Sequence, residues 1–167
     1  MARARPRRMV IGIGNPDRGD DGAGRAVTQH LRGVLPADVE IVAHDGETAG
    51  LVALLDGIAA AFLVDACASG APAGTVRRYD VTQGPLPAAS FGLSSHGLGL
   101  AEAIELARAL GCLPPCCVVY AIEGESFAIG TPLSLPVATA VGDVVAHVSG
   151  EILEPISNAK TPNSLPG

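Results

Sequence analysis

Large aromatic side chains are almost missing from this sequence. Its 167 residues include no Trp, two Tyr and three Phe, although 48% of the residues are hydrophobic. A core of this composition must be built from Ala, Val, Leu and Ile, which favours a sheet covered by helices on both faces. The length suits one well-buried domain and is short for two ordinary ones.

Membrane-spanning and export signals are also lacking. No stretch approaches the roughly 18 uninterrupted apolar residues of a membrane helix. Arg7 and Arg8 precede an apolar run, as in a twin-arginine signal, but that run ends within a few residues at Gly14 and Asn15. This is well short of the apolar core of a signal peptide. We therefore expect a cytoplasmic protein without membrane insertion.

A basic surface is absent as well. The formal net charge is −6, and four of the 11 basic residues lie near the N-terminus, at Arg3, Arg5, Arg7 and Arg8. Without them the chain has seven basic and 17 acidic groups, a formal charge of about −10. Because nucleic-acid phosphates require a basic surface, we expect no nucleic-acid partner.

Common nucleophile and zinc motifs are missing too. There is no Gly-x-Ser-x-Gly elbow and no His-Glu-x-x-His, and the four cysteines form no paired Cys-x-x-Cys arrangement. For Cys67, Cys112, Cys116 and Cys117, buried reduced thiols are a better interpretation than a zinc site or a disulfide. Adjacent Cys116 and Cys117 are expected on opposite faces of a strand.

Short β-branched runs alternate with helically spaced apolar residues along the chain, which predicts an α/β fold. Strands are expected at 9–14, 39–43, 60–65, 74–80 and 116–122, and helices at 21–32, 48–57, 95–110 and 134–149. The loop between the third and fourth strands is too short for a helical crossover, so strand 74–80 is predicted to run antiparallel to its predecessor. Thr48, Ser94 and Ser134 are the expected N-caps.

One domain is expected over residues 9–153. An Arg-rich tail over 1–8 precedes it, and residues 154–167 are predicted to form a disordered C-terminal tail because they carry no periodic apolar pattern.

The most informative segment is Gly12-Ile-Gly-Asn-Pro-Asp-Arg-Gly-Asp20-Asp21-Gly-Ala-Gly24, which joins a strand to a helix. A dinucleotide fingerprint would need a third glycine where Asp17 stands. Three aspartates would also repel a phosphate. An N-cap role accounts for Asp20 or Asp21 but not for both. Paired carboxylates at this turn therefore indicate a cation.

Asp65 and His96 are predicted to join this loop at one edge of the sheet. Asp21 follows the first strand, Asp65 ends the third, and His96 opens the third helix, so all three should lie beyond the carboxyl ends of the strands. Two carboxylates and one imidazole suit a borderline divalent ion such as nickel or zinc. Asp20 is an alternative to Asp21 as the first ligand.

Asp45 is a further carboxylate near the same edge. It either orients a ligand, acts as a general base, or only forms the turn before Gly46. His44 is a reserve candidate, whereas His30 and His147 lie on predicted helices and should be solvated.

Four more segments follow the glycine loop in order: Asp45-Gly-Glu-Thr-Ala-Gly50, Leu63-Val-Asp65-Ala, Ser95-His96-Gly-Leu-Gly-Leu100 and Ile122-Glu-Gly-Glu-Ser126. With the loop they span roughly residues 9 to 150, and together they resemble the hydrogenase maturation proteases. These endopeptidases trim the C-terminal extension from the large subunit of nickel-iron hydrogenases.

The resemblance implies a three-layer α/β/α fold of the phosphorylase/hydrolase-like type, with a mixed, mostly parallel five-stranded sheet in which strand 74–80 is reversed. It implies that Asp21, Asp65 and His96 contact nickel, and it favours Asp21 over Asp20. The implied partner is a large-subunit precursor, which supplies the nickel.

An endopeptidase acting on that precursor is thus the first hypothesis. A non-catalytic metal-handling or chaperone-like module for the same client is one alternative, and cleavage of a precursor would discriminate between the two. A small-molecule or nucleotide-binding α/β enzyme is another, and the acidic loop disfavours it. The sequence leaves open the oligomeric state, the particular client and whether nickel is catalytic or only recognised.

Overall fold

The computed structural model describes residues 5–87, 91 and 97–154. Within them the sheet consists of five strands, and helices follow each strand except β3, which is followed directly by β4. The elements are β1 (Arg8–Ile13), η1 (Gly19–Gly22), α1 (Ala23–Leu31), β2 (Val39–His44), α2 (Thr48–Leu55), β3 (Ala60–Cys67), β4 (Val76–Asp80), α4 (Gly97–Ala109), β5 (Cys116–Glu123) and α5 (Leu135–Leu153).

The strand order is β2-β1-β3-β5-β4. β1 pairs in parallel with β2 and with β3, and β3 pairs in parallel with β5. The edge strand β4 runs antiparallel to β5, so the predicted reversal of this strand is confirmed. The chain leaves β1 first towards β2 and then crosses to β3. The point where the strand order reverses, which is where open α/β sheets bind ligands, lies between β1 and β3.

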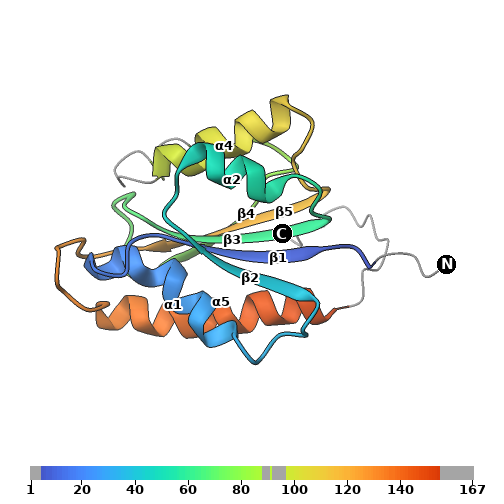
Figure 1. The fold of residues 1–167 in the computed structure, drawn as a ribbon. Coiled ribbons are helices and arrows are strands. Elements are labelled where there is room, and N and C mark those ends of the chain that lie inside the picture. The colour runs from blue at the N-terminus through green and yellow to red at the C-terminus, as the bar shows by residue number, and fades with distance from the viewer. Residues whose placement is uncertain (1–4, 88–90, 92–96, 155–167) are drawn as a thin grey trace, which may run out of the picture.

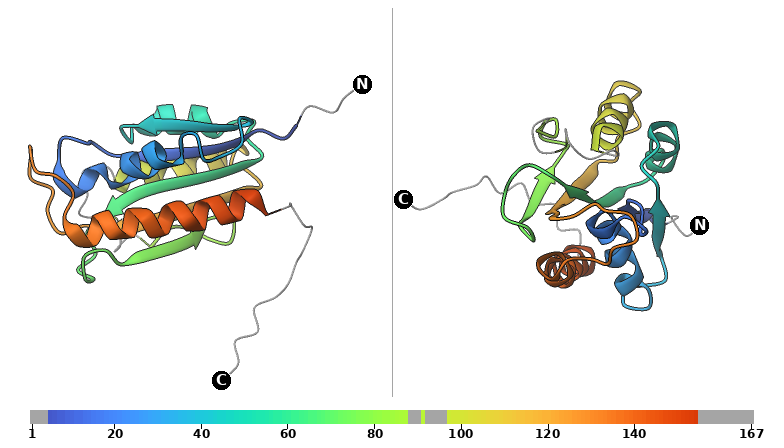
Figure 2. Two further views of the ribbon diagram at one scale, coloured as in Figure 1. Left: turned by 90° about the horizontal axis from the view of Figure 1, so that it is seen from below. Right: turned by 90° about the vertical axis from the view of Figure 1, so that its left-hand side faces the viewer.

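Helices cover both faces of the sheet, giving the predicted three layers. Figure 1 shows α2 and α4 on one face and α1 and α5 on the other, and the end-on view in Figure 2 shows the sheet between them. None of the helices in the described part of the chain is long and apolar enough to span a bilayer.

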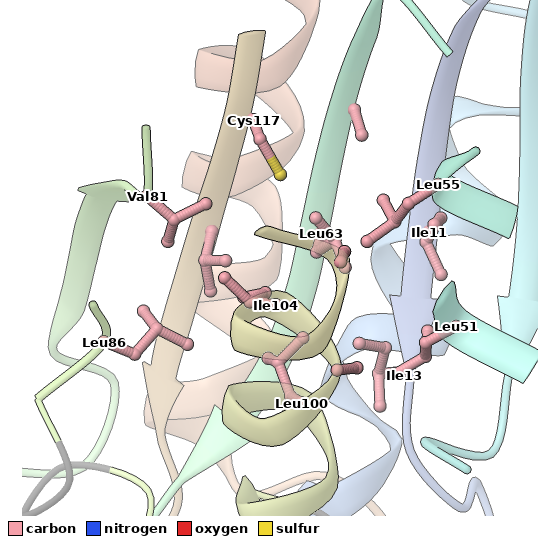
Figure 3. Close-up of a cluster of buried hydrophobic side chains, with 14 of the residues drawn as sticks. Ile11, Ile13, Leu51, Leu55, Leu63, Val81, Leu86, Leu100, Ile104 and Cys117 are labelled. Atoms are coloured by element: carbon pink, nitrogen blue, oxygen red, sulfur yellow. The ribbon is translucent and has the colours of Figure 1, made fainter. Parts of the chain in front are cut away.

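Aliphatic side chains fill both interfaces between the sheet and its helices. On the face of α2 and α4, residues such as Ile11, Leu63, Leu51 and Ile104 form one buried cluster (Figure 3). On the opposite face, valines dominate the contact of α5 with the sheet. The scarcity of aromatic residues is therefore compatible with a continuous core on both faces.

Several element boundaries differ from the predictions. The predicted helix 21–32 is divided into η1 and α1, and β3 continues to Cys67, because Ala66 and Cys67 pair with Ile122 and Glu123 of β5. Asp65 therefore lies inside β3 and not at its end. α5 continues to Leu153, four residues beyond the predicted end.

The predicted N-caps also need correction. Glu47, not Thr48, caps α2, because its carboxylate accepts hydrogen bonds from Ala49 N and Gly50 N. Ser134 occupies the N-cap position of α5, but its side chain makes no capping hydrogen bond. Ser94 lies outside the described residues.

The cysteines are all free, but not all of them are buried. Cys67 and Cys117 are buried, whereas Cys112 is half-buried and Cys116 is exposed. Cys116 is the first residue of β5, and it is exposed whereas the other residues of that strand are buried. The expectation of four buried thiols was therefore wrong for these two residues.

Glycines allow α1 to approach the sheet closely. A methyl group at Gly12 would lie 2.3 Å from the carbonyl oxygen of Gly24, and a methyl group at Gly24 would lie 2.3 Å from the carbonyl oxygen of Val64. Both distances are shorter than any real contact of a methyl carbon with backbone. Only glycine at these two positions lets the start of α1 pack onto β1 and β3.

We predict that Gly24→Ala destabilises the fold by about 3 kcal/mol, because the methyl group must displace backbone of β1 and β3. The matched control is Gly142→Ala on α5, where an added methyl group meets nothing within 4 Å. That substitution should stabilise the protein by about 0.5–1 kcal/mol through helix propensity. Urea unfolding of the two variants measures both effects. Equal stabilities would show that α1 does not need this approach.

Candidate functional site

Gly14 allows η1 to fold back over the end of β1. Gly14 has φ of 133°, and a methyl group there would lie 1.9 Å from the carbonyl oxygen of Asp21. Its N–H donates to the carbonyl oxygen of His44, which extends the pairing of β1 with β2 beyond Ile13. The loop therefore places Asp20 and Asp21 directly beyond the carboxyl end of β1.

The two adjacent aspartates serve different neighbours, and neither caps a helix. The N-cap positions of η1 and α1 are Arg18 and Gly22, and neither makes a side-chain capping bond. Both aspartates are buried, with 0% of Asp20 and 2% of Asp21 exposed. Two buried carboxylates in sequence must each be compensated separately.

Asp20 is compensated by the loop between β5 and α5. Its carboxylate accepts hydrogen bonds from the N–H groups of Glu125, Ser126 and Ser134, at 2.7–3.1 Å, and from the Ser134 hydroxyl at 2.9 Å. Burial alone would raise the pKa of Asp20, but these donors lower it overall. Asp20 thus attaches residues 124–134 to η1, and Figure 1 shows this loop beside η1 at the left of the view.

Asp21 faces the switch point between β1 and β3. Its Oδ2 accepts a hydrogen bond from Asn15 N at 3.0 Å, and its charge acts on Asp65. The carboxylate of Asp20 is bound by the 124–134 loop. Of the two adjacent aspartates, Asp21 is therefore the one that acts on Asp65, the second predicted ligand.

Asp65 is a buried carboxyl group that its surroundings in the described part of the chain compensate poorly. It is fully buried, and among the described residues neither carboxylate oxygen has a hydrogen-bond partner. Leu63 and Cys67, two residues away on either side, belong to the cluster under α2 and α4, so Asp65 faces the same helical layer. Burial and then the nearby charge of Asp21 raise the pKa of Asp65 well above its usual range.

The remaining predicted residues are placed less completely. His96 lies outside the described residues, and α4 begins at the next residue, Gly97. Asp45 is largely exposed; its Oδ1 accepts a hydrogen bond from Glu47 N and lies 3.5 Å from His44 Nδ1. His30 and His147 are exposed, as predicted.

Glu123 is a buried carboxylate whose role the sequence did not predict. It accepts hydrogen bonds from the N–H groups of Ser69 and Gly70, the Ser69 hydroxyl and the Cys67 thiol. It therefore holds the turn that follows β3. An acidic residue directly after the apolar run of β5 was the signal that could have identified it.

Three of the cysteines, Cys67, Cys116 and Cys117, are poor nucleophiles. Burial raises the pKa of Cys67 and of Cys117 to about 12, and in Cys67 the hydrogen bond to Glu123 adds to this. Burial also raises the pKa of Cys116. Thiolates at these positions are disfavoured at neutral pH, which agrees with the absence of a recognisable nucleophile motif.

Asp21 and Asp65 together form a buried acidic pair that either retains a proton or binds a cation. Within the described residues no three or more His, Cys, Asp or Glu side chains are grouped closely enough to hold a metal ion. The third ligand predicted from the sequence, His96, is outside that part of the chain. Carboxylate oxygens are hard donors, and a pair of them suits a divalent cation.

Comparison with known proteins places these residues in context. Residues 26–151 match the model of the family HycI, hydrogenase maturation protease. This match covers 126 of 167 residues and contains Asp45, Asp65 and His96, while the glycine loop with Asp21 precedes it. No curated protein matches the sequence significantly.

Several solved structures have the same fold. The chain is similar to the hydrogenase maturating endopeptidase HybD from E. coli, at 26% identity and a TM-score of 0.73, over 85% of this chain and 89% of that one. It is similar to an endopeptidase from Escherichia coli, at 23% identity and a TM-score of 0.74, over 84% and 89%. A nickel-iron hydrogenase maturation protease, HycI from Thermococcus kodakarensis KOD1, is 21% identical with a TM-score of 0.69, over 90% and 96%.

The opposite environments of Asp20 and Asp65 generate a prediction about stability. A carboxyl with a raised pKa, such as Asp65, stabilises the fold fully only below its unfolded pKa of about 4, and this contribution is lost as pH rises through the folded pKa. Asp65→Asn should therefore be more stable than wild type near neutral pH, with a gain that disappears towards acid pH.

Asp20→Asn is the matched control. Because the pKa of Asp20 is lowered, its contribution is present above the unfolded pKa and is lost as pH falls through the folded pKa. The amide NH2 of Asn would also face the N–H and O–H donors that bind Asp20, and two donors cannot form a hydrogen bond. The free energy of unfolding of this variant should therefore fall by about 2 kcal/mol or more at neutral pH. Urea unfolding at several pH values compares the two. Destabilisation by Asp65→Asn at neutral pH would mean that Asp65 is compensated in the protein.

Proposed function

Because the chain belongs to the hydrogenase maturation protease family and is therefore an endopeptidase, we propose that it removes the C-terminal extension of a nickel-loaded large-subunit precursor of a nickel-iron hydrogenase. In this proposal Asp21, Asp65 and His96 contact the nickel that the precursor carries. The observation that carries the proposal is the buried pair of Asp21 and Asp65. Neither oxygen of Asp65 makes a hydrogen bond of ordinary geometry among the described residues, and the backbone N–H of Ala66 has the smallest of three effects on its pKa.

A cation supplied by the client accounts for this arrangement. An ionised carboxylate without donors or a counter-charge is costly to bury, and proteins retain one mainly where a ligand completes the site. Three side chains leave a nickel coordination sphere incomplete, and thiolates from the client can supply the other ligands. The metal would then bridge the two proteins, so precursor with nickel is distinguished from precursor without it.

His96 fits this role through its position before α4. The positive end of a helix disfavours imidazolium and favours the neutral imidazole that binds metals. Asp65 faces the helical layer that contains α4, and the residue after His96 begins that helix. We therefore assign His96 as the third ligand.

The peptide bond is cleaved without a cysteine nucleophile in this proposal, because the pKa of each buried thiol is raised. Water is the attacking group, and the chain positions the scissile bond beside Asp21 and Asp65. Bound nickel would polarise the carbonyl or the water. Asp45, exposed at the turn after β2, would orient the client.

We predict that Asp21→Ala, Asp65→Ala and His96→Ala each reduce precursor cleavage at least about 100-fold, because each removes a contact to the same metal. Their effects should not add in double variants. The assay is electrophoretic separation of precursor and trimmed large subunit, with mass spectrometry of the released peptide.

Asp143→Ala is the control, because Asp143 is an exposed acidic residue on α5. It should cleave nickel-loaded precursor at the wild-type rate. Wild-type protein should leave metal-free precursor intact. Equal cleavage of the two precursors, or normal cleavage by two of the three site variants, would overturn the proposed site.

A further inference from the structure

Arg25 and Asp21 bind the same peptide group from its two sides. The Nε of Arg25 donates to the carbonyl oxygen of Gly14 at 2.8 Å, and the N–H of Asn15, in that same peptide group, donates to Asp21 Oδ2 at 3.0 Å. The C=O and N–H of a trans peptide point in opposite directions. The guanidinium therefore has a fixed position relative to Asp21, at a separation that two or three residues of an extended substrate would span.

A small pocket lies beside Arg25. It has a volume of about 190 Å³, and its wall includes Arg25, Gln29, Pro16, Ala26 and Leu133. Gly19 and Gly22, which flank Asp20 and Asp21 in the sequence, also line it. The pocket therefore adjoins the η1 segment that carries Asp21, on the side of α1, and it has apolar surface on several sides and a guanidinium at one position.

The guanidinium keeps most of its donors for a ligand. Among the described residues, the bond to Gly14 is the only hydrogen bond of Arg25, and no carboxylate forms an ion pair with it. Four of its five N–H groups, on Nη1 and Nη2, are therefore available. A planar guanidinium fork with free Nη groups binds carboxylates in a bidentate manner.

The pocket is also held in shape before a ligand arrives. Leu133 belongs to the 124–134 loop, and its neighbour Ser134 donates two hydrogen bonds to the buried Asp20. The N–H of Gly19 donates to the carbonyl oxygen of Thr131, which closes the same side. Preorganisation of this kind lowers the entropic cost of binding.

We propose that this pocket binds a carboxylate of the client close to the scissile bond, which makes Arg25 a specificity-determining residue. This inference rests on the proposed function. The carboxylate belongs either to an Asp or Glu side chain near the cleavage site or to the C-terminus of the extension. The apolar wall would contact the aliphatic part of that residue, and the Nη groups of Arg25 would bind its charge.

Charge reversal at Arg25 tests the pocket. Arg25→Glu should lower kcat/KM for nickel-loaded precursor about 10-fold or more, mainly through KM, because the contact binds substrate and does not act on the reacting bond. The matched control is Arg32→Glu, the same charge change on an exposed residue seven positions further along the sequence, just after α1. The kcat/KM of Arg32→Glu should stay within about twofold of the wild-type value.

Complementary changes in the precursor identify the carboxylate. Acidic residues on either side of the cleavage site are replaced one at a time by Lys, and in a separate precursor the extension is lengthened by several residues. One Lys precursor should be cut faster by Arg25→Glu than by wild type if a side chain is bound. If lengthening the extension slows cleavage by wild type but causes no further loss in Arg25→Glu, the bound group is the C-terminal carboxylate.

A binding measurement separates this inference from the proposed function. A fluorescent peptide covering the cleavage segment and extension should bind more weakly to Arg25→Glu than to wild type and Arg32→Glu, whether or not the precursor is cut. Failure of wild type to cleave nickel-loaded precursor would refute the proposed function. The other adverse outcome is that Arg25→Glu cleaves more slowly, yet binds the peptide as wild type does and shows no preference for a Lys precursor. That result would refute carboxylate binding in the pocket and would assign Arg25 only to the support of the Gly14 peptide group.

Discussion

The close approach of α1 to β1 and β3 is the constraint on which the site depends. It is possible because Gly12 and Gly24 have no side chain where the backbones meet. Gly14 then lets η1 turn back over the end of β1, so that Asp21 lies at the switch point beside β3, the strand that contains Asp65. Without these glycines the first carboxylate would be held away from the second.

Asp20 and Asp21 show how neighbouring, chemically identical residues are separated by their surroundings. Asp20 accepts four hydrogen bonds from the 124–134 loop and is a structural anion with a lowered pKa. Asp21 receives a hydrogen bond from Asn15 and acts on Asp65. The same anchoring of the 124–134 loop also shapes the pocket beside Arg25. The short segment after β1 therefore supplies both an aspartate that supports the structure and an aspartate of the candidate site.

Sequence patterns predict much of this fold because its core elements are periodic. The runs that became β1, β2 and β5 are apolar and β-branched, and the spacing of valines in α5 identifies its buried face. The short connection after β3 was sufficient to predict a reversed β4. In addition, the ordered motifs indicated the family that the chain belongs to.

The features that the sequence did not predict depend on long-range contacts. The role of Asp20 could not be predicted locally, because its partners lie more than 100 residues away. Several polar residues before α2 could cap it, and only the backbone geometry selects Glu47. The sequence predicted that β3 ends at Asp65. Pairing with β5 extends the strand past that residue.

The central claim is that Asp21 and Asp65 contact nickel carried by the client. X-ray absorption at the nickel of the precursor, recorded alone and with the protein, tests it most directly. We expect wild-type protein to add oxygen or nitrogen neighbours to the nickel, and Asp65→Ala to add fewer. A nickel spectrum that wild-type protein leaves unchanged, under conditions where the two proteins form a complex, would contradict the claim.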